Sequence, residues 1–315
     1  MLLAHQIGNK ELEVTKAQAD FLDQCHIYLI CSRPNLWYKP DNLRIINTPR
    51  RAIVSGYLCK RASGNITEQS FHLIIDLEIG TSAKLGEYPF RNIVIVDDND
   101  CVVRTFPATL AAQFRLPFST YSDCKVLYVG QALGDDGKRS ALTRLARHST
   151  LQRIFADTLH TDPDSEIVAV LANYENAMIF TQFDGSANAS ADPAEEDQRL
   201  SNVLDHQPDL KQVVCLAEAS LIRYFRPKYN EVYKEHFPKA SQKILNDCFR
   251  LDFAAITCEI VTSELCFRLH SDAVGAGQHH IKQFMLHDPD QRRTFSTFVD
   301  NDGTYHKIDI SGPVY

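Results

Sequence analysis

The stretch Lys125-Val-Leu-Tyr-Val-Gly-Gln131 decides the fold, because it is a clear strand pattern and opens a regular alternation of strands and helices. Simple alternation along this strand predicts one face with Val126, Tyr128 and Gly130 and an opposite face with Leu127 and Val129. Tyr128 is then either a core aromatic or a site residue. Gly130 either lets a ligand approach the backbone or begins the turn that follows.

Downstream of this strand the chain predicts a compact αβ unit. The pattern indicates a helix from Arg139 to Asp157, a strand from Glu166 to Ala172 and a helix from Leu210 to Phe225. Upstream, the sequence predicts a helix from Lys10 to Cys25, a strand from His26 to Cys31, and short β-branched strands between Ala52 and Pro107. Asn92–Asp97 and Cys101–Thr105 read as a hairpin with an Asp- and Asn-rich turn.

These differences in predicted secondary structure divide the chain into three consecutive parts of a mixed α+β protein. Residues 1–117 form a strand-rich part, 118–235 the αβ unit, and 236–315 one helix followed by further strands. We expect the first part to bind the substrate or a partner chain.

Composition excludes several classes of protein. The 315 residues are 44% hydrophobic and 23% charged, as in globular proteins, and we expect no membrane-spanning segment. The net charge of −7 gives no global reason to bind nucleic acid, so any such contact requires local basic patches. Nine cysteines without a CxxC pair indicate reduced, mostly buried thiols and a cytoplasmic location.

Glu218 is the most informative charged residue. It lies four residues after Val214 and three before Leu221, on the apolar face of the predicted helix Leu210–Phe225. A carboxylate that faces the interior requires a cation. Either a buried salt bridge or a metal ion satisfies it, and both interpretations stay open.

The predicted helix Arg139–Asp157 contains no acidic residue before its last position. Arg144 and His148 are four residues apart and share a face, with Arg147 beside them. A guanidinium and an imidazole presented together suit a phosphate group, although a basic helix face is often simply solvated.

The segment from Cys31 to Arg61 is a second basic region. It holds seven Lys or Arg residues and one acid, with Trp37, Tyr38 and Tyr57 interleaved. Such a mixture suits a groove that neutralises phosphates and stacks bases, but also an ordinary solvated loop and strand. The candidate nucleic-acid contacts here are Arg33, Lys39, Arg50, Arg51, Lys60 and Arg61.

Taken together, these motifs resemble the GIY-YIG nuclease family over about 110 residues. Tyr128-Val-Gly130 is similar to the second signature tripeptide, and Arg144 and His148 are similar to the Arg-x-x-x-His helix. Glu218 is similar to the metal-binding glutamate and Asn230 to the late asparagine.

The chain departs from the family pattern in two places. The first tripeptide, Gly-Ile-Tyr about ten residues before the second, has no counterpart in Pro117-Phe-Ser-Thr-Tyr-Ser-Asp123, where Tyr121 is the nearest tyrosine. The spacing from Tyr128 to Arg144 is also long, so that Arg139 or Arg147 is an alternative to Arg144.

The resemblance implies a metal-dependent endonuclease that acts on DNA in preference to RNA, with restriction or defence against foreign DNA as its setting. Glu218 is then expected to hold Mg²⁺ or Mn²⁺, Arg144 to neutralise the phosphate, and Tyr128 or Tyr121 to orient the attacking water. His148 would assist proton transfer or bind phosphate. Gly130, Arg147, Asn230, Arg50, Arg51 and Lys60 are expected to contact nucleic acid. Because one site cuts one strand, double-strand cleavage needs a dimer or two sequential nicks, and of these we favour a homodimer or higher homo-oligomer.

Two alternatives belong to other classes. In the first, the chain is a nucleic-acid-binding or assembly protein that keeps the αβ core and has lost catalysis, as the absent first tripeptide favours. In the second, the pattern is coincidental and Glu218 is a salt-bridged core residue of an unrelated enzyme.

Overall fold

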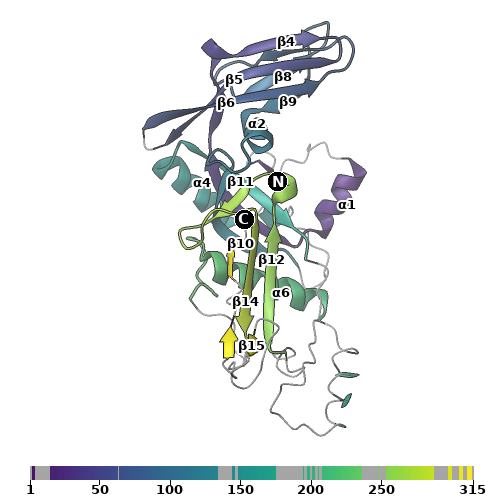
Figure 1. Ribbon diagram of the computed structural model, residues 1–315, viewed down its shortest axis with the longest axis vertical. Helices are drawn as coiled ribbons and strands as arrows, with labels where there is room; N and C mark the ends of the chain where they lie inside the picture. Colours follow the sequence, from purple (N-terminus) through teal and green to yellow (C-terminus); the bar gives the residue numbers. More distant parts are fainter. Residues whose placement is uncertain are drawn as a thin grey trace.

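A five-stranded sheet at the centre of the molecule takes its strands from distant parts of the sequence (Figure 1). The strand order is β1-β11-β2-β10-β13. β10 and β11 both run antiparallel to β2, and β13 runs parallel to β10. The strands are β1 (Leu2–Leu3), β2 (Ile27–Pro34), β10 (Asp123–Gln131), β11 (Ser165–Ala172) and β13 (Arg268–His270).

This computed structural model describes residues 2–3, 15–62, 64–133, 144–145, 148–174, 194, 197–198, 201–202, 205, 208–235, 248, 253–286, 297–299, 305–307 and 311–313. Within them the chain is a mixture of helices and sheets, and the predicted α+β class is confirmed. The predicted strands in β2, β10 and β11 are also confirmed.

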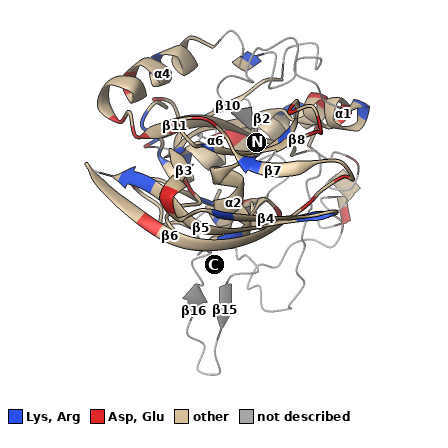
Figure 2. Cartoon of the chain, turned by 90° about the horizontal axis from the view of Figure 1, so that it is seen from above, with Lys and Arg blue, Asp and Glu red and all other residues tan. Residues whose placement is uncertain are grey.

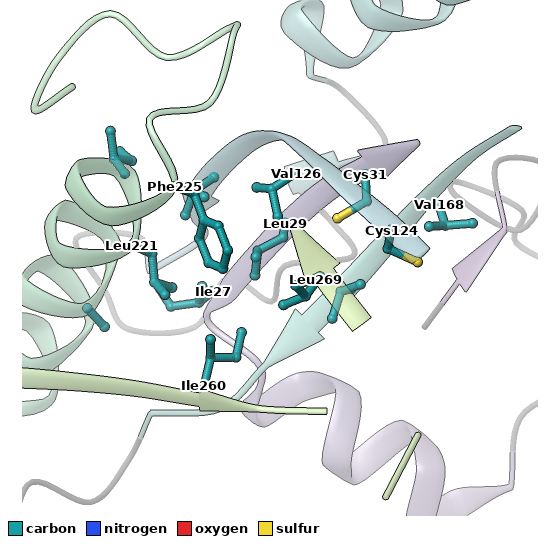
Figure 3. Packing of buried hydrophobic residues seen from close by; sticks show 14 of the residues in the cluster. Ile27, Leu29, Cys31, Cys124, Val126, Val168, Leu221, Phe225, Ile260 and Leu269 are labelled. Carbon is teal, nitrogen blue, oxygen red and sulfur yellow. The ribbon is translucent and has the colours of Figure 1, made fainter. Parts of the chain in front are cut away.

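Helix α6 (Leu210–Phe225) covers one face of the sheet and has the predicted bounds. Asp209 caps its first turn in a capping box with Gln212, and Arg226 ends it in the left-handed conformation before Pro227. Figure 3 shows Leu221 and Phe225 of α6 directed at Ile27 and Leu29 of β2, which are fully buried.

Helix α4 (Ser149–Thr161) packs on the opposite face of the sheet, where its Leu151 and Ile154 contact the cluster of Tyr28 and Ile30. The prediction of one helix from Arg139 to Asp157 was wrong. Arg144 and Leu145 are helical, but His148 is extended, with φ −87° and ψ 112°, and α4 begins after it. Ser149 and Thr150 are residue types that favour helix starts over helix interiors. Residues 134–143 and 146–147 lie outside the described residues.

A bulge in β10 changes which face its residues occupy. The register with β2 shifts between Val126 and Tyr128, so Leu127 and Tyr128 both pack toward α4, while Val126 and Val129 pack toward α6. The predicted strict alternation was therefore wrong, because one extra residue in a strand reverses the facing of those beyond it.

Between β2 and β10 the chain forms a separate β-rich body, drawn in the upper part of Figure 1 and called here the inserted body (residues 35–122). The predicted hairpin of β8 and β9 is confirmed, and the core holds Tyr38, Leu58, Ile93 and Ala111. One of its sheets contains β3 (Leu36–Tyr38), β4 (Arg44–Thr48), β5 (Arg51–Ala62) and β6 (Asn65–Asp76). The other sheet contains β7 (Ser82–Leu85), β8 (Asn92–Val96) and β9 (Val102–Pro107). The inserted body also contains the helix α2 (Ala108–Arg115) and the 3-10 turn η2 (Pro40–Asn42).

The C-terminal part contributes β13 to the central sheet and also forms further strands. They are β12 (Ala255–Val261), β14 (His279–Met285) and β17 (Ser311–Pro313) in one sheet, and β15 (Thr297–Val299) with β16 (Tyr305–Lys307) in another. A 3-10 turn, η3 (Ser263–Leu265), follows β12. The helix expected after Phe237 lies outside the described residues except at Cys248, and α1 (Lys16–Gln24) is the described part of the first predicted helix.

The arrangement differs from three consecutive parts. The boundary expected at residue 117 assigned β2 to the N-terminal part, whereas β2 is the middle strand of the central sheet and the inserted body begins only after it. The reason is long-range pairing: Cys25 to Cys31 is continuously buried because both of its faces are covered. The local sequence pattern does not show which distant strand this segment pairs with.

Two further expectations concern the whole chain. No helix among the described residues combines the length and apolar character needed to cross a lipid bilayer. All nine cysteines are free and five of them are buried, which confirms the expected use of cysteine as a thiol.

The Arg33 side chain links two strands of the central sheet by an ion pair and the inserted body by a hydrogen bond. The Nε of Arg33 on β2 donates to the Oε1 of Glu166 on β11 at 2.6 Å, and its Nη2 donates to the Oγ1 of Thr109 on α2 at 3.1 Å. Arg33 is buried, with 7% of its side chain exposed, and Glu166 keeps 23%. Removing Arg33 therefore leaves a largely buried carboxylate without its cation.

We expect Arg33→Met to lower the free energy of unfolding by roughly 2–3 kcal/mol in urea titrations, because the unpaired Glu166 carboxylate stays partly desolvated. The matched control is Lys84→Met, since Lys84 pairs with Asp100 in a solvent-exposed bridge. That change should cost less than about 1 kcal/mol. Equal small effects of both substitutions would show that the Arg33 pair contributes no more than a surface bridge.

Candidate active site

Two tyrosines and a glycine meet where β2 begins and β10 ends. Tyr28 of β2 stands opposite Gly130 of β10, and its ring centroid lies 6.2 Å from that of Tyr128. A Cβ atom on Gly130 would lie 2.6 Å from both Cζ and Oη of Tyr28. Gly130 is therefore required by the Tyr28 ring, and neither of the two interpretations from the sequence, a ligand approach or a turn, is needed to explain it.

His148 and Arg144 join these tyrosines from the segment before α4. The His148 ring lies 5.2 Å from Tyr128 and 5.9 Å from Tyr28, centroid to centroid. Burial lowers the pKa of His148, and the nearby Arg144 cation lowers it further, so this imidazole is neutral at pH 7. Arg144 itself is exposed, which leaves its guanidinium accessible to a ligand.

Glu218 completes the group from α6. Burial raises the pKa of this carboxyl to about 7, opposed by hydrogen bonds from the backbone and side chain of Gln131 and by the charge of Arg144. Among the described residues, Glu218 makes no salt bridge within 4.0 Å, so that part of the chain offers no partner for the buried-salt-bridge interpretation.

These side chains lie close enough for the charge of one to shift the pKa of another. Burial raises the pKa of Tyr128; the Glu218 charge raises it further and Arg144 lowers it. Burial and the neighbouring Tyr128 raise the pKa of Tyr28, Arg144 lowers it through a hydrogen bond and its charge, and the Glu218 charge raises it slightly. The structure thus brings together Tyr128, Gly130, Arg144, His148 and Glu218, as the sequence predicted, and adds Tyr28.

One polar atom of this cluster lacks a protein partner. The His148 Nδ1 is buried and has no hydrogen-bond partner in the described part of the chain, whereas the buried Tyr28 hydroxyl interacts with Arg144 and Tyr128 inside the cluster. Buried polar atoms are almost always hydrogen-bonded in native proteins, to protein groups or to water. Next to an exposed arginine, this atom provides hydrogen-bonding capacity for an anionic ligand or for water.

The donor set fits one kind of metal ion. Glu218 is a single carboxylate, and no group of three or more His, Cys, Asp or Glu side chains suited to a metal occurs in the described ranges. A closed site built entirely from protein ligands is therefore not formed by those residues. A single carboxylate does suit Mg²⁺ or Mn²⁺, which accept oxygen ligands; Mg²⁺ usually keeps several waters and also binds substrate phosphates.

No protein-family model, curated protein or solved structure matches this chain. The case for a site therefore rests on the arrangement of these side chains and on the motifs that they form.

Asn230 positions the strand that carries the site. It is buried, with 8% of its surface exposed; its Nδ2 donates to the carbonyl of Val129 and its Oδ1 accepts from the Val129 N–H, both at 2.9 Å. The neighbouring Tyr229 N–H donates to the carbonyl of Leu127. These bonds hold the chain after α6 against β10, between the two residues that contact Tyr28. The expected contact of Asn230 with nucleic acid stays a prediction.

Tyr121 lies elsewhere. It belongs to the core of the inserted body, and its hydroxyl donates to Thr67 at 3.1 Å. The tyrosine that accompanies Tyr128 is Tyr28, in His26-Ile-Tyr28 at the start of β2. The sequence did contain a signal, an Ile-Tyr pair opening an apolar strand, but the inserted body separates it from Tyr128 in the chain.

The basic residues of the N-terminal region are mostly engaged within the protein. Figure 2 shows Lys and Arg mixed with Asp and Glu on the strands of the inserted body. Lys39 pairs with Glu68, Arg51 with Asp76 and Arg61 with Asp164, while Lys60 donates to the Thr120 carbonyl and hydroxyl. Arg50 is exposed and pairs with no acid in the described part of the chain, and Arg147 lies outside it.

We expect Gly130→Ala to destabilise the protein by roughly 1–3 kcal/mol, because the added methyl group collides with the fully buried Tyr28 ring. The control is Gly275→Ala, where the nearest atom to the added Cβ is Pro313 Cγ at 3.8 Å. Thermal unfolding measures both. An unchanged midpoint for Gly130→Ala would contradict the close packing of Tyr28 on β10.

We expect Glu218→Gln to stabilise the protein above pH 7 in the presence of EDTA, and not near pH 4. The pKa of Glu218 rises from 4.5 to about 7 on folding, so stability falls as pH rises between these values and stays low above them. The gain at pH 8 is at most about 3 kcal/mol. Urea titrations from pH 4 to 8 measure it, and the exposed Glu78→Gln serves as the control. A variant that gains nothing at pH 8 would argue against a buried Glu218 carboxylate.

Proposed function

We propose that this protein is a metal-dependent endonuclease that hydrolyses phosphodiester bonds, with DNA as its substrate. The observation that carries the proposal is the gathering of Tyr28, Tyr128, Arg144, His148 and Glu218 at one end of the β2–β10 pair. His26-Ile-Tyr28 stands in the position of the first tripeptide of the GIY-YIG family, with His in place of Gly. The departure at Pro117–Asp123 is then explained by the inserted body.

Each residue has a role that its environment supports. Exposed Arg144 neutralises charge on the scissile phosphate, as a well-placed cationic donor does in phosphoryl chemistry. Because burial raises the pKa of Tyr28 and of Tyr128, both hydroxyls keep their protons at neutral pH and orient the attacking water as hydrogen-bonding groups.

His148 is better suited than either tyrosine to accept the proton of that water. Burial and Arg144 lower the pKa of His148, so it is neutral at pH 7, and its Nδ1 has no described partner. A divalent ion held by Glu218 would add positive charge at the phosphate and at the leaving oxygen. With its pKa near 7, Glu218 is about half ionised at pH 7 and becomes fully ionised, and able to bind a cation, at higher pH.

The setting of the reaction follows from the resemblance and from the composition. We propose restriction or defence against foreign DNA as the role, and the cytoplasm as the location, in keeping with nine free thiols. The described residues of one chain form one such cluster, so cutting both strands of a duplex requires a homodimer or two successive nicks.

Purified protein should nick supercoiled plasmid DNA with Mg²⁺ or Mn²⁺ and not with EDTA. Glu218→Ala should abolish cutting, and Arg144→Ala should reduce the rate roughly 100-fold or more, because each removes charge stabilisation at the phosphate. Tyr28→Phe should also impair cutting.

The matched control is Tyr121→Phe, which removes the same hydroxyl from the inserted body and should leave the rate unchanged. Equal activity of Glu218→Ala and the parent protein would refute the proposal. Binding of DNA without cutting of DNA or RNA would indicate instead a binding protein that has lost catalysis.

A further inference from the structure

Tyr229 supports two cations beside the candidate active site. Its ring lies 5.0 Å from Lys228 Nζ and 5.6 Å from Arg153 Cζ, measured to the ring centroid. Its hydroxyl donates to Asp157 Oδ2 at 2.8 Å, which fixes the orientation of the ring. We call Arg153, Lys228 and Tyr229 the Tyr229 platform. Cations over an aromatic face are held in place at modest cost and stay accessible to solvent.

The platform carries more positive charge than its surroundings neutralise. Asp157 is the acid that contacts it, and its carboxylate lies 3.9 Å from Arg153, whose side chain is 70% exposed. Lys228 is exposed and pairs with no acid among the described residues. Both cations stand over one ring and are therefore at most about 11 Å apart. Like charges held this close favour the binding of an anion between or across them.

The platform lies on the same side of the sheet as the catalytic group. Tyr229 packs against the cluster that contains Tyr28 and Tyr128, and its N–H donates to the carbonyl of Leu127, next to Tyr128. Arg153 lies in the first turns of α4, five residues after His148, which immediately precedes that helix.

We propose that the Tyr229 platform is a second phosphate-binding site that holds the DNA backbone beside the scissile phosphate. The proposal rests on the proposed nuclease function and assigns its substrate a second point of contact. Arg153 and Lys228 bind phosphate oxygens, and Tyr229 positions them. Such contacts are independent of base sequence, so the platform contributes to affinity and to the alignment of the strand without taking part in the chemistry.

The test separates binding from cutting. A short fluorescein-labelled DNA duplex is titrated with Glu218→Gln protein, and with the same protein carrying Arg153→Gln, Lys228→Gln or both. At about 0.1 M salt each substitution should weaken binding about 5- to 10-fold, and each should reduce the slope of log K against log salt by about 1. Arg153→Lys and Lys228→Arg should retain most of the affinity, because the charge is kept.

Arg226→Gln is the matched control. Arg226 lies two residues before Lys228 and is exposed, but its Nη2 binds Glu235 at 2.7 Å. It should leave affinity and salt slope unchanged. With Glu218 present, the platform variants should raise KM for plasmid cutting and leave kcat within about 2-fold, since phosphate contacts outside the reacting group act mainly on binding.

The outcomes distinguish the two proposals. Binding by the parent protein with an unchanged affinity and salt slope in the double variant overturns the platform and leaves the nuclease proposal intact. A loss in kcat without a change in affinity also overturns it, since Arg153 and Lys228 would then act in the chemistry. If Glu218→Gln protein does not bind DNA at any salt concentration and the parent does not cut it, both proposals are wrong.

Discussion

The contact between the Tyr28 ring and the Cα of Gly130 sets the register on which the rest of the site depends. A Cβ atom at position 130 would collide with the Tyr28 ring, so only a glycine of β10 fits opposite Tyr28. This requirement fixes the register of β2 and β10 at this end. A slip by one residue would turn Tyr28 to the opposite face, against α6, and bring a side chain against its ring. Asn230 secures the same register from the other side by binding both backbone groups of Val129.

The two faces of the central sheet differ in the residues that cover them. The face toward α6 is an ordinary apolar core, in which Leu29, Val129 and Phe225 are fully buried. The face toward α4 mixes apolar groups with tyrosine hydroxyls and the His148 imidazole, whose Nδ1 has no described partner. Glu218 extends from the apolar side to the end of β10, where Gln131 hydrogen-bonds it. The bulge after Val126 is responsible for this difference between the faces, because it directs both Leu127 and Tyr128 to the α4 face.

The sequence predicted those features that depend on local periodicity. The bounds of α6, the hairpin of β8 and β9, and the placement of Glu218 on the packed side of its helix all follow from apolar spacing. The features it did not predict depend on distant or subtle effects. Tyr28 was missed because the inserted body separates β2 from its partner strand. The break at His148 and the bulge in β10 were missed because each is a change of one residue within a pattern that otherwise continues.

The inserted body joins the central sheet at the end of β2 and β10 that lies away from the tyrosines. Pro34 and Asp123 are the last and first residues of two neighbouring antiparallel strands, six residues or about 20 Å along β2 from Tyr28. In topological terms the whole body occupies the place of a hairpin turn. An exchange of this segment for another of different size or surface would keep the Tyr28–Gly130 end of the pair in register. The inserted body can therefore change in evolution or by protein engineering without disturbing the cluster at the other end of these strands.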